Sequence, residues 1–571
     1  MRYIYDNYVT IALRDRTDVA AVVWRPVSGT APTLMVRLPY GTHEPAGPVA
    51  GGHAEYSPYV MNLLDAGYAV VWIESRGTYR SEGTFTPVVD EPADAEDAIN
   101  WIVDQEWSDG RIGAYGFSYF GMTQWAAAST GHPALKAIAP AATTMNWHSG
   151  CWYSSGGLMS QSLVAWWHAF MYLAEELRAA ARGEATPGRT DDLISLLSKE
   201  DDLIRVASIA KQPVLARRWL PEYLENADYG EYWYAHDFTR NVSQMKPPAL
   251  VIGGWFDLFI NTQVRDWLRV RRLGGTEVAR SDSRLIVGPW GHEYSIGQYP
   301  DANFGPYGNQ IMADLTNEHI AFFDRHVKDV KDETIPPAPA VRIFVMGRNE
   351  WVEAEEFPLP DTTDVDFYLS GDALNSEPGD PWEKSYDFDP SNPTPTKGGA
   401  LLPGTFGMAG PVDQGEINDR LDVLSFQSPV LERDHDVIGF VKARLYVASS
   451  ALDTDFTAKL IDVGPDGRAV SVCDGALRMR YRAGLDDPQL LEPGRVYEVE
   501  IDVAVTAMTF RTGHRIRLDV SSSNFPRFDV NSNTGGALWS EGPEDRVVAR
   551  NTIYGGMHRP SRLILPVHRL V

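Results

Sequence analysis

Short apolar runs alternate with helical segments through residues 1–145 of this 571-residue chain, and this alternation constrains the fold more than any other feature. Each run has the length of a buried strand, is bounded by glycine, proline or charge, and is separated from the next by residues such as 93–103 with a helical period. The pattern is typical of a mostly parallel sheet with helices on both faces. Residues 9–25 predict an initial hairpin. The predicted strands are residues 33–38, 69–74, 111–115 and 135–141.

The alternation is interrupted once and then resumes. Aromatic residues around Trp152 lead into a charged, helix-favouring stretch, so residues 146–244 are predicted to be a helical insertion. Strand-like runs return at 248–253 and 284–288, and a helix over 311–327 is expected to close this architecture. After a proline-rich link at 335–339, short alternating runs and turn residues are typical of an all-β sandwich. The predicted division is 1–145 and 245–352 for the first domain, 146–244 for the insertion and 353–571 for the β domain.

Composition limits the classes of function. Hydrophobic residues make up 44% of the chain and charged residues 22%, as in ordinary globular proteins. The net charge of −26 opposes binding to nucleic acid or to an anionic membrane. The two cysteines, Cys151 and Cys473, are too few for a disulfide framework or a thiolate metal cluster. Because the first residues lack a signal-peptide pattern and no long apolar run occurs, we expect a cytoplasmic protein.

Ser118 lies between a predicted strand and a predicted helix, in the segment Gly116-Phe-Ser-Tyr-Phe-Gly121. A serine hydroxyl becomes a nucleophile when a sharp turn exposes it, a base takes its proton and nearby donors meet the oxyanion. The general pattern G-x-S-x-G would place glycine at 120, where this chain has Phe120. Taken alone, the segment also fits an ordinary turn between a strand and a helix.

Two later residues complete the expected order of a catalytic triad. Enzymes of the α/β-hydrolase class deliver serine, then an acid, then histidine, with the last two on loops after later strands. Here Asp257 ends the apolar run that begins at Pro248, and His292 ends the run that begins at Ser283. Either residue alone would be expected to cap an element or face solvent. Three such residues in the required order predict a serine hydrolase.

In these residues the chain resembles the cocaine-esterase family of α/β-hydrolases. That family is related to Xaa-Pro dipeptidyl peptidases and α-amino-acid ester hydrolases. The resemblance extends over essentially the whole chain, and the family's own pattern G-x-S-Y-x-G accounts for Phe120. The matching stretches are Arg37-Leu-Pro-Tyr40, Arg76-Gly-Thr-Tyr-Arg-Ser-Glu-Gly83, Gly116-Phe-Ser-Tyr-Phe-Gly121, Gly254-Trp-Phe-Asp257 and Gly288-Pro-Trp-Gly-His292.

The resemblance implies a role for each site residue. Ser118 is expected to be the nucleophile, His292 the general base and Asp257 the residue that orients the histidine. An oxyanion hole is expected from the backbone N–H of Tyr119 and the phenol of Tyr40; without the resemblance, Tyr40 would be interpreted as a packed aromatic. The substrate pocket is expected to contain three aromatic side chains, although Trp166, Trp167 and Phe170 also fit the core face of a helix. The three expected pocket residues are Trp152, Trp167 and Phe259.

The resemblance also implies an architecture: an α/β-hydrolase domain with an inserted helical cap, followed by a C-terminal jelly-roll domain. Fold analogy alone does not predict that the jelly roll binds sugar, so a packing role is expected. The spacing Asp529-Val-Asn531-Ser-Asn533 is like the opening of a calcium loop but lacks the glycine and the final glutamate, so no metal site is expected. The chemistry requires no cofactor. A small ester or amide is the expected partner, and dimers among relatives make a homodimer one expectation.

The reaction class stays open between two alternatives. A carboxylesterase for aromatic or bulky acyl groups is the first. The second is an Xaa-Pro dipeptidyl peptidase or α-amino-acid ester hydrolase, which requires carboxylates that hold a free ammonium group. The insertion contains acidic residues, but such a charge run is usually a solvated helix face. These residues are Glu175, Glu176, Asp191 and Asp192.

Overall fold

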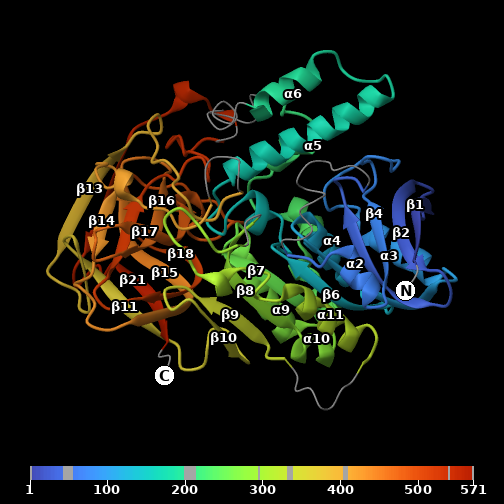
Figure 1. The fold of residues 1–571 in the computed structure, drawn as a ribbon. Helices are drawn as coiled ribbons and strands as arrows, with labels where there is room; N and C mark the ends of the chain where they lie inside the picture. The colour runs from blue at the N-terminus through green and yellow to red at the C-terminus, as the bar shows by residue number, and fades with distance from the viewer. Residues whose placement is uncertain are drawn as a thin grey trace.

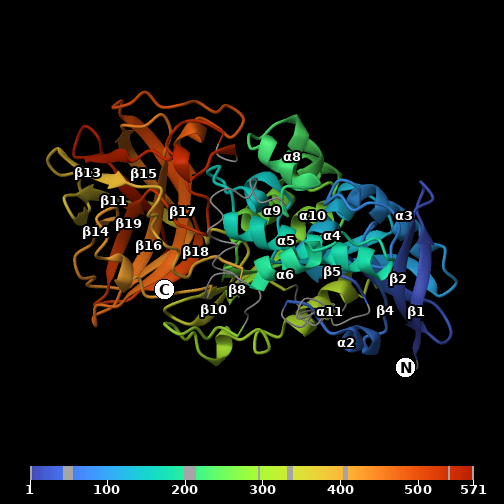
Figure 2. The same cartoon turned by 90° about the horizontal axis from the view of Figure 1, so that it is seen from above.

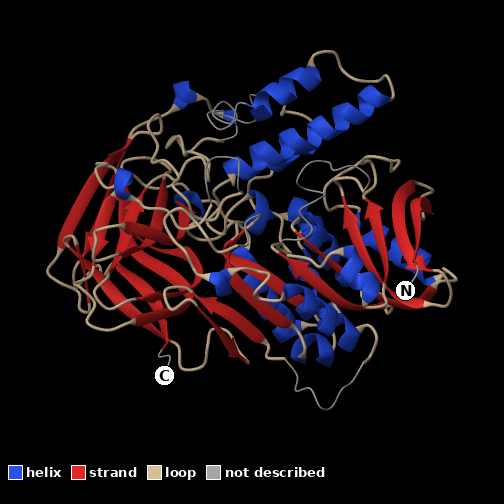
Figure 3. Cartoon of the chain, in the orientation of Figure 1, coloured by secondary structure: helices blue, strands red, loops and turns tan. Residues whose placement is uncertain are grey.

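The computed structural model describes residues 3–42, 56–198, 214–292, 296–330, 338–402, 409–537 and 540–568. Within these ranges the chain forms two large β-sheets, which lie side by side in the molecule (Figure 1). The N-terminal half has helices packed around its sheet, whereas the C-terminal half consists mainly of strands and loops (Figure 3). The predicted succession of a mixed α/β domain and an all-β domain is confirmed.

The first sheet is parallel through its middle. Its ten strands in the described residues are β1 (Tyr3–Ala12), β2 (Asp18–Pro26), β3 (Ala31–Leu38), β4 (Ala69–Glu74), β5 (Ser108–Phe117), β6 (Leu135–Ala141), β7 (Leu250–Phe256), β8 (Arg284–Gly291), β9 (Val341–Val345) and β10 (Glu350–Ala354). Their spatial order is β1-β2-β4-β3-β5-β6-β7-β8-β9-β10. Pairing is parallel from β4 to β9, and β1 and β2 form the predicted hairpin. The four strands predicted before residue 145 all lie within β3, β4, β5 and β6.

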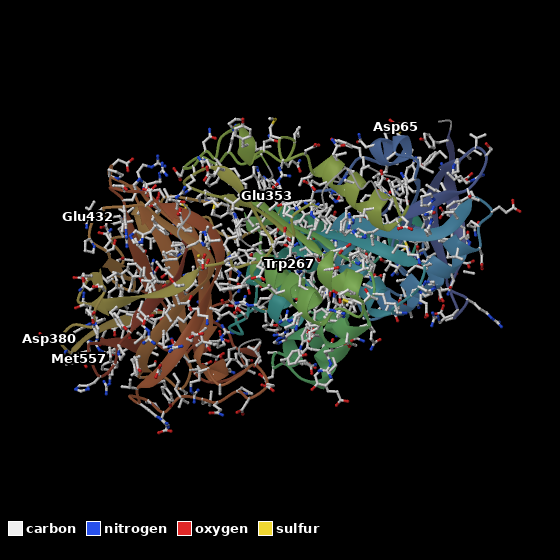
Figure 4. The ribbon with its side chains drawn as sticks, turned by 90° about the horizontal axis from the view of Figure 1, so that it is seen from below. Asp65, Trp267, Glu353, Asp380, Glu432 and Met557 are labelled. Atoms are coloured by element: carbon white, nitrogen blue, oxygen red, sulfur yellow. The ribbon has the colours of Figure 1, made fainter. Side chains whose placement is uncertain are left out.

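Helices cover both faces of this sheet. They are α2 (Val60–Asp65), α3 (Glu91–Val103), α4 (Tyr119–Ser129), α9 (Ile260–Leu273), α10 (Glu277–Ser281) and α11 (Leu315–His326). Figure 2 shows α3, α4, α9 and α10 on one side of the strands and α2 and α11 on the other. Because both faces are covered, every residue of β3, β7 and β8 is buried. Trp267 of α9, labelled in Figure 4, is only 1% exposed.

The helix predicted over 311–327 is confirmed as α11, but it starts later than expected and does not close this domain. The helix predicted to begin at Ile311 begins only at Leu315, because Asp314 adopts a left-handed backbone conformation with φ 60°. That helix also does not close the architecture, since β9 pairs in parallel with β8 and β10 then pairs with β9. Short alternating runs predict strands, but they do not specify which sheet the strands join. Residues 335–337 of the proline-rich link lie outside the described residues.

The described residues between β6 and β7 are mainly helical, as predicted. They contain a single π-helical turn, η2 (His148–Trp152), the long helix α5 (Gln161–Ala181), and the helices α6 (Arg189–Ser198) and α8 (Trp219–Glu225). Helices α5 and α6 lie side by side as a hairpin above the first sheet (Figure 1). None of the described helices is long and apolar enough to cross a membrane.

The second sheet is built almost entirely from antiparallel pairs. Its strands are β11 (Thr363–Ser370), β12 (Ala373–Asn375), β13 (Trp382–Phe388), β14 (Leu424–Gln427), β15 (His435–Ser449), β16 (Asp455–Val463), β17 (Ala469–Arg478), β18 (Tyr497–Phe510), β19 (Arg515–Ser521), β20 (Ala549–Gly555) and β21 (Arg562–His568). In the described residues the order is β13-β20-β15-β21-β11-β12-β14-β19-β16-β17, with β18 paired to β15. Its apolar side chains form a second core.

A buried ionic network joins the second domain to the first. The guanidinium of Arg478 donates to Asp455 and Asp529 at 3.0 Å each, and its side chain is only 4% exposed. Asp529 also accepts the backbone N–H of Met159 at 2.8 Å, and its own N–H donates to the Met159 carbonyl. Asn531, from the calcium-like spacing, donates its amide to Asp455 at 2.8 Å. The network therefore holds the residues just before α5 against the β domain.

We predict that Arg478→Met lowers the free energy of unfolding by about 3–5 kcal/mol, because the buried Asp455 and the largely buried Asp529 lose their counter-ion. Urea unfolding followed by tryptophan fluorescence measures this loss. The matched control is Arg495→Met, which breaks an ion pair with Glu492 whose side chains are 57% and 72% exposed. Exposed pairs contribute about 0–1 kcal/mol, so equal losses in the two variants would contradict the prediction.

Candidate active site

Ser118 occupies a sharp turn at the carboxyl end of β5. Its backbone has φ 57° and ψ −127°, and its N–H donates to the Ala141 carbonyl at 2.9 Å before α4 begins at Tyr119. A side chain at Gly116 would place its Cβ 2.7 Å from Phe120, and φ there is 127°. Gly121 is equally confined, because its Cβ would lie 2.6 Å from Thr143. Glycine is thus required at 116 and 121, which explains why the second glycine of the motif stands at 121 rather than 120.

The three residues predicted to form a triad lie together. The Oγ of Ser118 is 3.0 Å from Nε2 of His292, and Nδ1 of His292 is 2.7 Å from Oδ2 of Asp257. Oδ1 of Asp257 accepts the N–H of Phe259 at 2.7 Å, which fixes the carboxylate plane. Asp257 is fully buried and His292 is 3% exposed, whereas Ser118 is half-buried. They follow β7, β8 and β5, so the carboxyl ends of parallel strands bring them together. This arrangement can move a proton from serine to histidine.

Tyr40 and Tyr119, the predicted oxyanion-hole residues, lie beside each other. Tyr40 follows β3, and its hydroxyl oxygen accepts the indole N–H of Trp167 at 2.9 Å. The rings of Tyr40 and Tyr119 are 6.3 Å apart in an edge contact. As the first residue of α4, Tyr119 has a backbone N–H without a carbonyl partner inside the helix. The site therefore contains a helix N-terminus directly after the serine and the ring of Tyr40 beside Tyr119.

The predicted pocket residues are buried in two groups. Trp167 stacks on Tyr119 with ring centroids 6.2 Å apart, and Trp152 packs on Trp167 at 5.3 Å. Phe259 lies instead against His292, with an edge contact at 5.4 Å. Trp166 and Phe170, which the sequence also suggested for a helix core, stack on each other and are only partly buried. The side of α5 that bears Trp167 therefore faces the site.

Comparison with known proteins identifies the family. Residues 15–294 match the family model of the X-Pro dipeptidyl-peptidase (S15 family), and residues 335–564 match that of the X-Pro dipeptidyl-peptidase C-terminal non-catalytic domain. The cocaine esterase of Rhodococcus sp. (strain MB1 Bresler) is 39% identical over 583 residues, which cover 99% of each chain. The chain belongs to the cocaine-esterase family of serine hydrolases. The family prediction is thereby confirmed.

Solved structures agree with this membership at the level of the fold. An aminopeptidase from a marine sediment archaeon, Thaumarchaeota archaeon, has a TM-score of 0.81 at 22% identity, covering 99% of this chain and 96% of its own. An α-amino acid ester hydrolase has a TM-score of 0.79, also at 22% identity, covering 99% and 97%. Both parts of the chain therefore share their fold with these hydrolases.

Two of the four acidic residues considered for an ammonium site, Glu175 and Glu176, are paired with arginines in this member of the cocaine-esterase family. Glu176 accepts from Arg217 and from Arg189, each at 2.9 Å. Glu175 pairs with Arg217 at 3.3 Å and with Arg218. Burial alone would raise the pKa of Glu176, but the hydrogen bonds from Arg217 and Arg189 hold it below its ordinary value. Asp191 and Asp192 lie exposed in the first turn of α6.

The sequence did not suggest one buried residue that contacts the site, Glu91. It begins α3, accepts a hydrogen bond from the phenol of Tyr119 at 3.1 Å and pairs with Arg37 at 2.8 Å. Burial raises the pKa of Glu91, although Arg37 opposes this shift. Arg37 is the sequence feature that could have indicated a buried acidic partner, because a charge within an otherwise apolar strand requires one.

Proposed function

We propose that this protein hydrolyses carboxylic esters through an acyl-enzyme formed on Ser118. The observation that supports this most is the continuous chain of contacts from Ser118 to His292 at 3.0 Å and from His292 to Asp257 at 2.7 Å. His292 takes the Oγ proton as Ser118 attacks the substrate carbonyl carbon. The tetrahedral intermediate then collapses, and the imidazolium returns the proton to the departing alcohol.

The second half-reaction uses the same residues. A water molecule gives a proton to Nε2 of His292 and attacks the acyl carbon. As the new intermediate collapses, the C–Oγ bond breaks, the imidazolium returns its proton to Oγ, and the acid is released. Asp257 accepts the hydrogen bond from Nδ1 of His292, which keeps Nε2 able to accept a proton and stabilises the imidazolium.

Tyr40 and the N–H of Tyr119 are proposed to form the oxyanion hole. The hydrogen bond that Trp167 donates to the Tyr40 hydroxyl oxygen supports this, because it fixes the position of the phenol. The Tyr119 amide stands at the positive end of α4, which favours negative charge on an oxygen beside Ser118. Such donors typically contribute roughly 10²–10³ in turnover each.

The substrate class proposed is an ester with an aromatic or bulky acyl group. Support comes from Trp167 and Trp152 on one side of the site and from Phe259 beside His292, because aromatic walls favour apolar, flat groups. The ion pairs of Glu175 and Glu176 favour an ester over a peptide-like substrate, since neither carboxylate is left to hold a free ammonium group.

Three finer features belong to the same proposal. Residues 146–244 are proposed to act as a helical cap that contributes Trp152 and Trp167. The second domain, residues 353–571, is proposed to be a jelly roll that packs against the cap through Arg478 and Asp529. The homodimer and the cytoplasmic location stay predictions.

A substrate panel tests the class of reaction. The purified protein is assayed with acetyl, butyryl and benzoyl aryl esters, and with Xaa-Pro and aminoacyl anilides. We expect benzoyl esters to have the highest kcat/KM and substrates with a free amino group to fall roughly 10–100-fold below them, because a neutral pocket discriminates by that order. A fluorophosphonate probe should label Ser118, located by peptide mass mapping. Turnover confined to substrates with a free amino group would establish the peptidase-like alternative.

A further inference from the structure

A buried ionic cluster lies behind the turn that holds Ser118. Arg37 on β3 and Glu91 at the start of α3 have side chains that are 2% and 6% exposed, and Nη2 of Arg37 is 2.8 Å from Oε2 of Glu91. Nη1 of Arg37 also donates to the backbone carbonyl of Glu91 at 2.7 Å. Asp94 lies 3.7 Å from Arg37 and binds Arg76 at 2.8 Å. Removing these charged side chains from water costs free energy that their mutual attraction only partly recovers. The cluster is therefore not explained by a contribution to stability alone.

The second oxygen of Glu91 faces the active site. Oε1 accepts the hydroxyl of Ser75 at 3.0 Å and the phenol of Tyr119 at 3.1 Å. The same phenol oxygen accepts the backbone N–H of Val88 at 3.1 Å. The Tyr119 ring is also confined on its face, because it stacks on Trp167 with the planes inclined by 8°. The position of the Tyr119 side chain is therefore fixed both at its hydroxyl and along its ring.

The cluster is connected to both oxyanion donors of the proposed function. Tyr119 carries the amide donor, directly after Ser118 in the chain. Arg37 stands three residues before Tyr40 on the same stretch of chain, and its carbonyl accepts the hydroxyl of Thr123 from α4 at 3.1 Å. A single carboxylate thus ties together the strand that leads to Tyr40 and the helix that begins at Tyr119.

We propose that Glu91 is a positioning residue for the oxyanion hole, acting through its hydrogen bond to the Tyr119 phenol and its ion pair with Arg37. This inference rests on the proposed function, since it assumes that the Tyr119 amide and the Tyr40 phenol bind the oxyanion. The amide donor must lie about 2.7–3.1 Å from the oxyanion, so a small displacement of Tyr119 weakens it in the transition state. Substrate binding in the ground state depends much less on that distance.

Tyr119→Phe tests the proposal, because it removes one buried oxygen and keeps the stacked ring. We expect kcat per active site to fall about tenfold and KM to change less than about twofold, the signature of an interaction made in the transition state. Active sites are counted by burst titration with a phosphonate, so misfolded protein does not lower the value. The inhibition constant of an arylboronic acid, which forms a tetrahedral adduct on the serine, should rise by a similar factor.

Tyr115→Phe is the matched control. Tyr115 lies on β5, is 1% exposed, and its hydroxyl accepts the indole N–H of Trp72 at 3.0 Å, so the variant also deletes a buried phenol oxygen. This hydrogen bond does not involve Glu91 or either donor, and kcat per active site should equal that of the wild type. An equal fall in Tyr115→Phe, or an unchanged kcat in Tyr119→Phe, would overturn the proposal.

Glu91→Gln and the double variant complete the test. The Glu91→Gln substitution keeps the shape of the side chain and removes the charge that faces Arg37, so kcat per active site should again fall about tenfold. Because both changes are proposed to act by displacing Tyr119, the double variant should lose no more than the larger single loss. If the kcat losses of the two single variants multiplied in the double variant, Glu91 and Tyr119 would act independently and the proposal would be wrong. Failure of the proposed function would be distinguishable from failure of this inference. In that case the phosphonate would not titrate the wild-type protein either.

Discussion

Replacing Ser118 by alanine is expected to lower kcat for a benzoyl aryl ester by roughly 10⁶-fold, to the level that binding and the oxyanion hole alone provide. The reason is that Ser118 supplies the hydroxyl that lies 3.0 Å from the base His292, so no other group can form the acyl-enzyme in its place. Initial rates at high enzyme concentration, together with loss of fluorophosphonate labelling, measure the effect.

Ser129→Ala is the matched control for that variant. Ser129 lies at the other end of α4, is buried, and donates its hydroxyl to the Ala126 carbonyl at 2.7 Å. Its removal should leave kcat/KM unchanged. If Ser118→Ala retained turnover within tenfold of the wild type, Ser118 would not be the nucleophile and the proposed mechanism would fail.

The sequence could predict that Ser118, Asp257 and His292 lie together, because local features of the chain place each of them. Ser118, Asp257 and His292 each follow an apolar run, and parallel strands bring their carboxyl ends to one edge of the sheet. The difference from the general pattern G-x-S-x-G at Phe120 also has a local cause. Gly116 and Gly121 are the positions where a Cβ would clash with neighbouring side chains.

Other features depend on contacts between segments far apart in the chain, which periodicity does not reveal. Glu91 lies 54 positions from Arg37 in the chain, and only the tertiary fold brings the two residues together. The neutralisation of Glu175 and Glu176 likewise depends on Arg217, which the sequence places 41 positions after Glu176. The same limit explains why the first domain was expected to close with a helix, although β9 and β10 extend its sheet.

The pairing of carboxylates with arginines near the site bears on which substrates we propose. The carboxylates of α5 are paired with arginines, and Glu91 is paired with Arg37 behind Tyr119. Among the described residues named for the site, Asp257 is the remaining carboxylate, and His292 occupies its Oδ2. The three predicted pocket residues, Trp152, Trp167 and Phe259, are aromatic, which is the physical basis for proposing neutral esters as substrates.

Asp257→Asn is expected to lower kcat by about 10⁴-fold while the fold is retained. Oδ1 of an asparagine can still accept the N–H of Phe259, which Asp257 accepts at 2.7 Å, so the amide nitrogen would face Nδ1 of His292. That nitrogen donates a hydrogen bond, so Nδ1 must accept it and the ring proton moves to Nε2. Nε2 then faces the Ser118 hydroxyl as a donor and cannot take its proton.

The control for this variant is Asp462→Asn, which alters a second aspartate–histidine pair in the β domain. Asp462 lies 2.9 Å from Nδ1 of His514, so the substitution makes the same chemical change on β16, outside the domain that holds Ser118. We expect unchanged kcat/KM in Asp462→Asn, and in Asp257→Asn a fluorophosphonate reaction that is slowed by orders of magnitude but still labels Ser118. A fall of less than tenfold in Asp257→Asn would mean that His292 is oriented by other contacts, and the assigned role of Asp257 would be wrong.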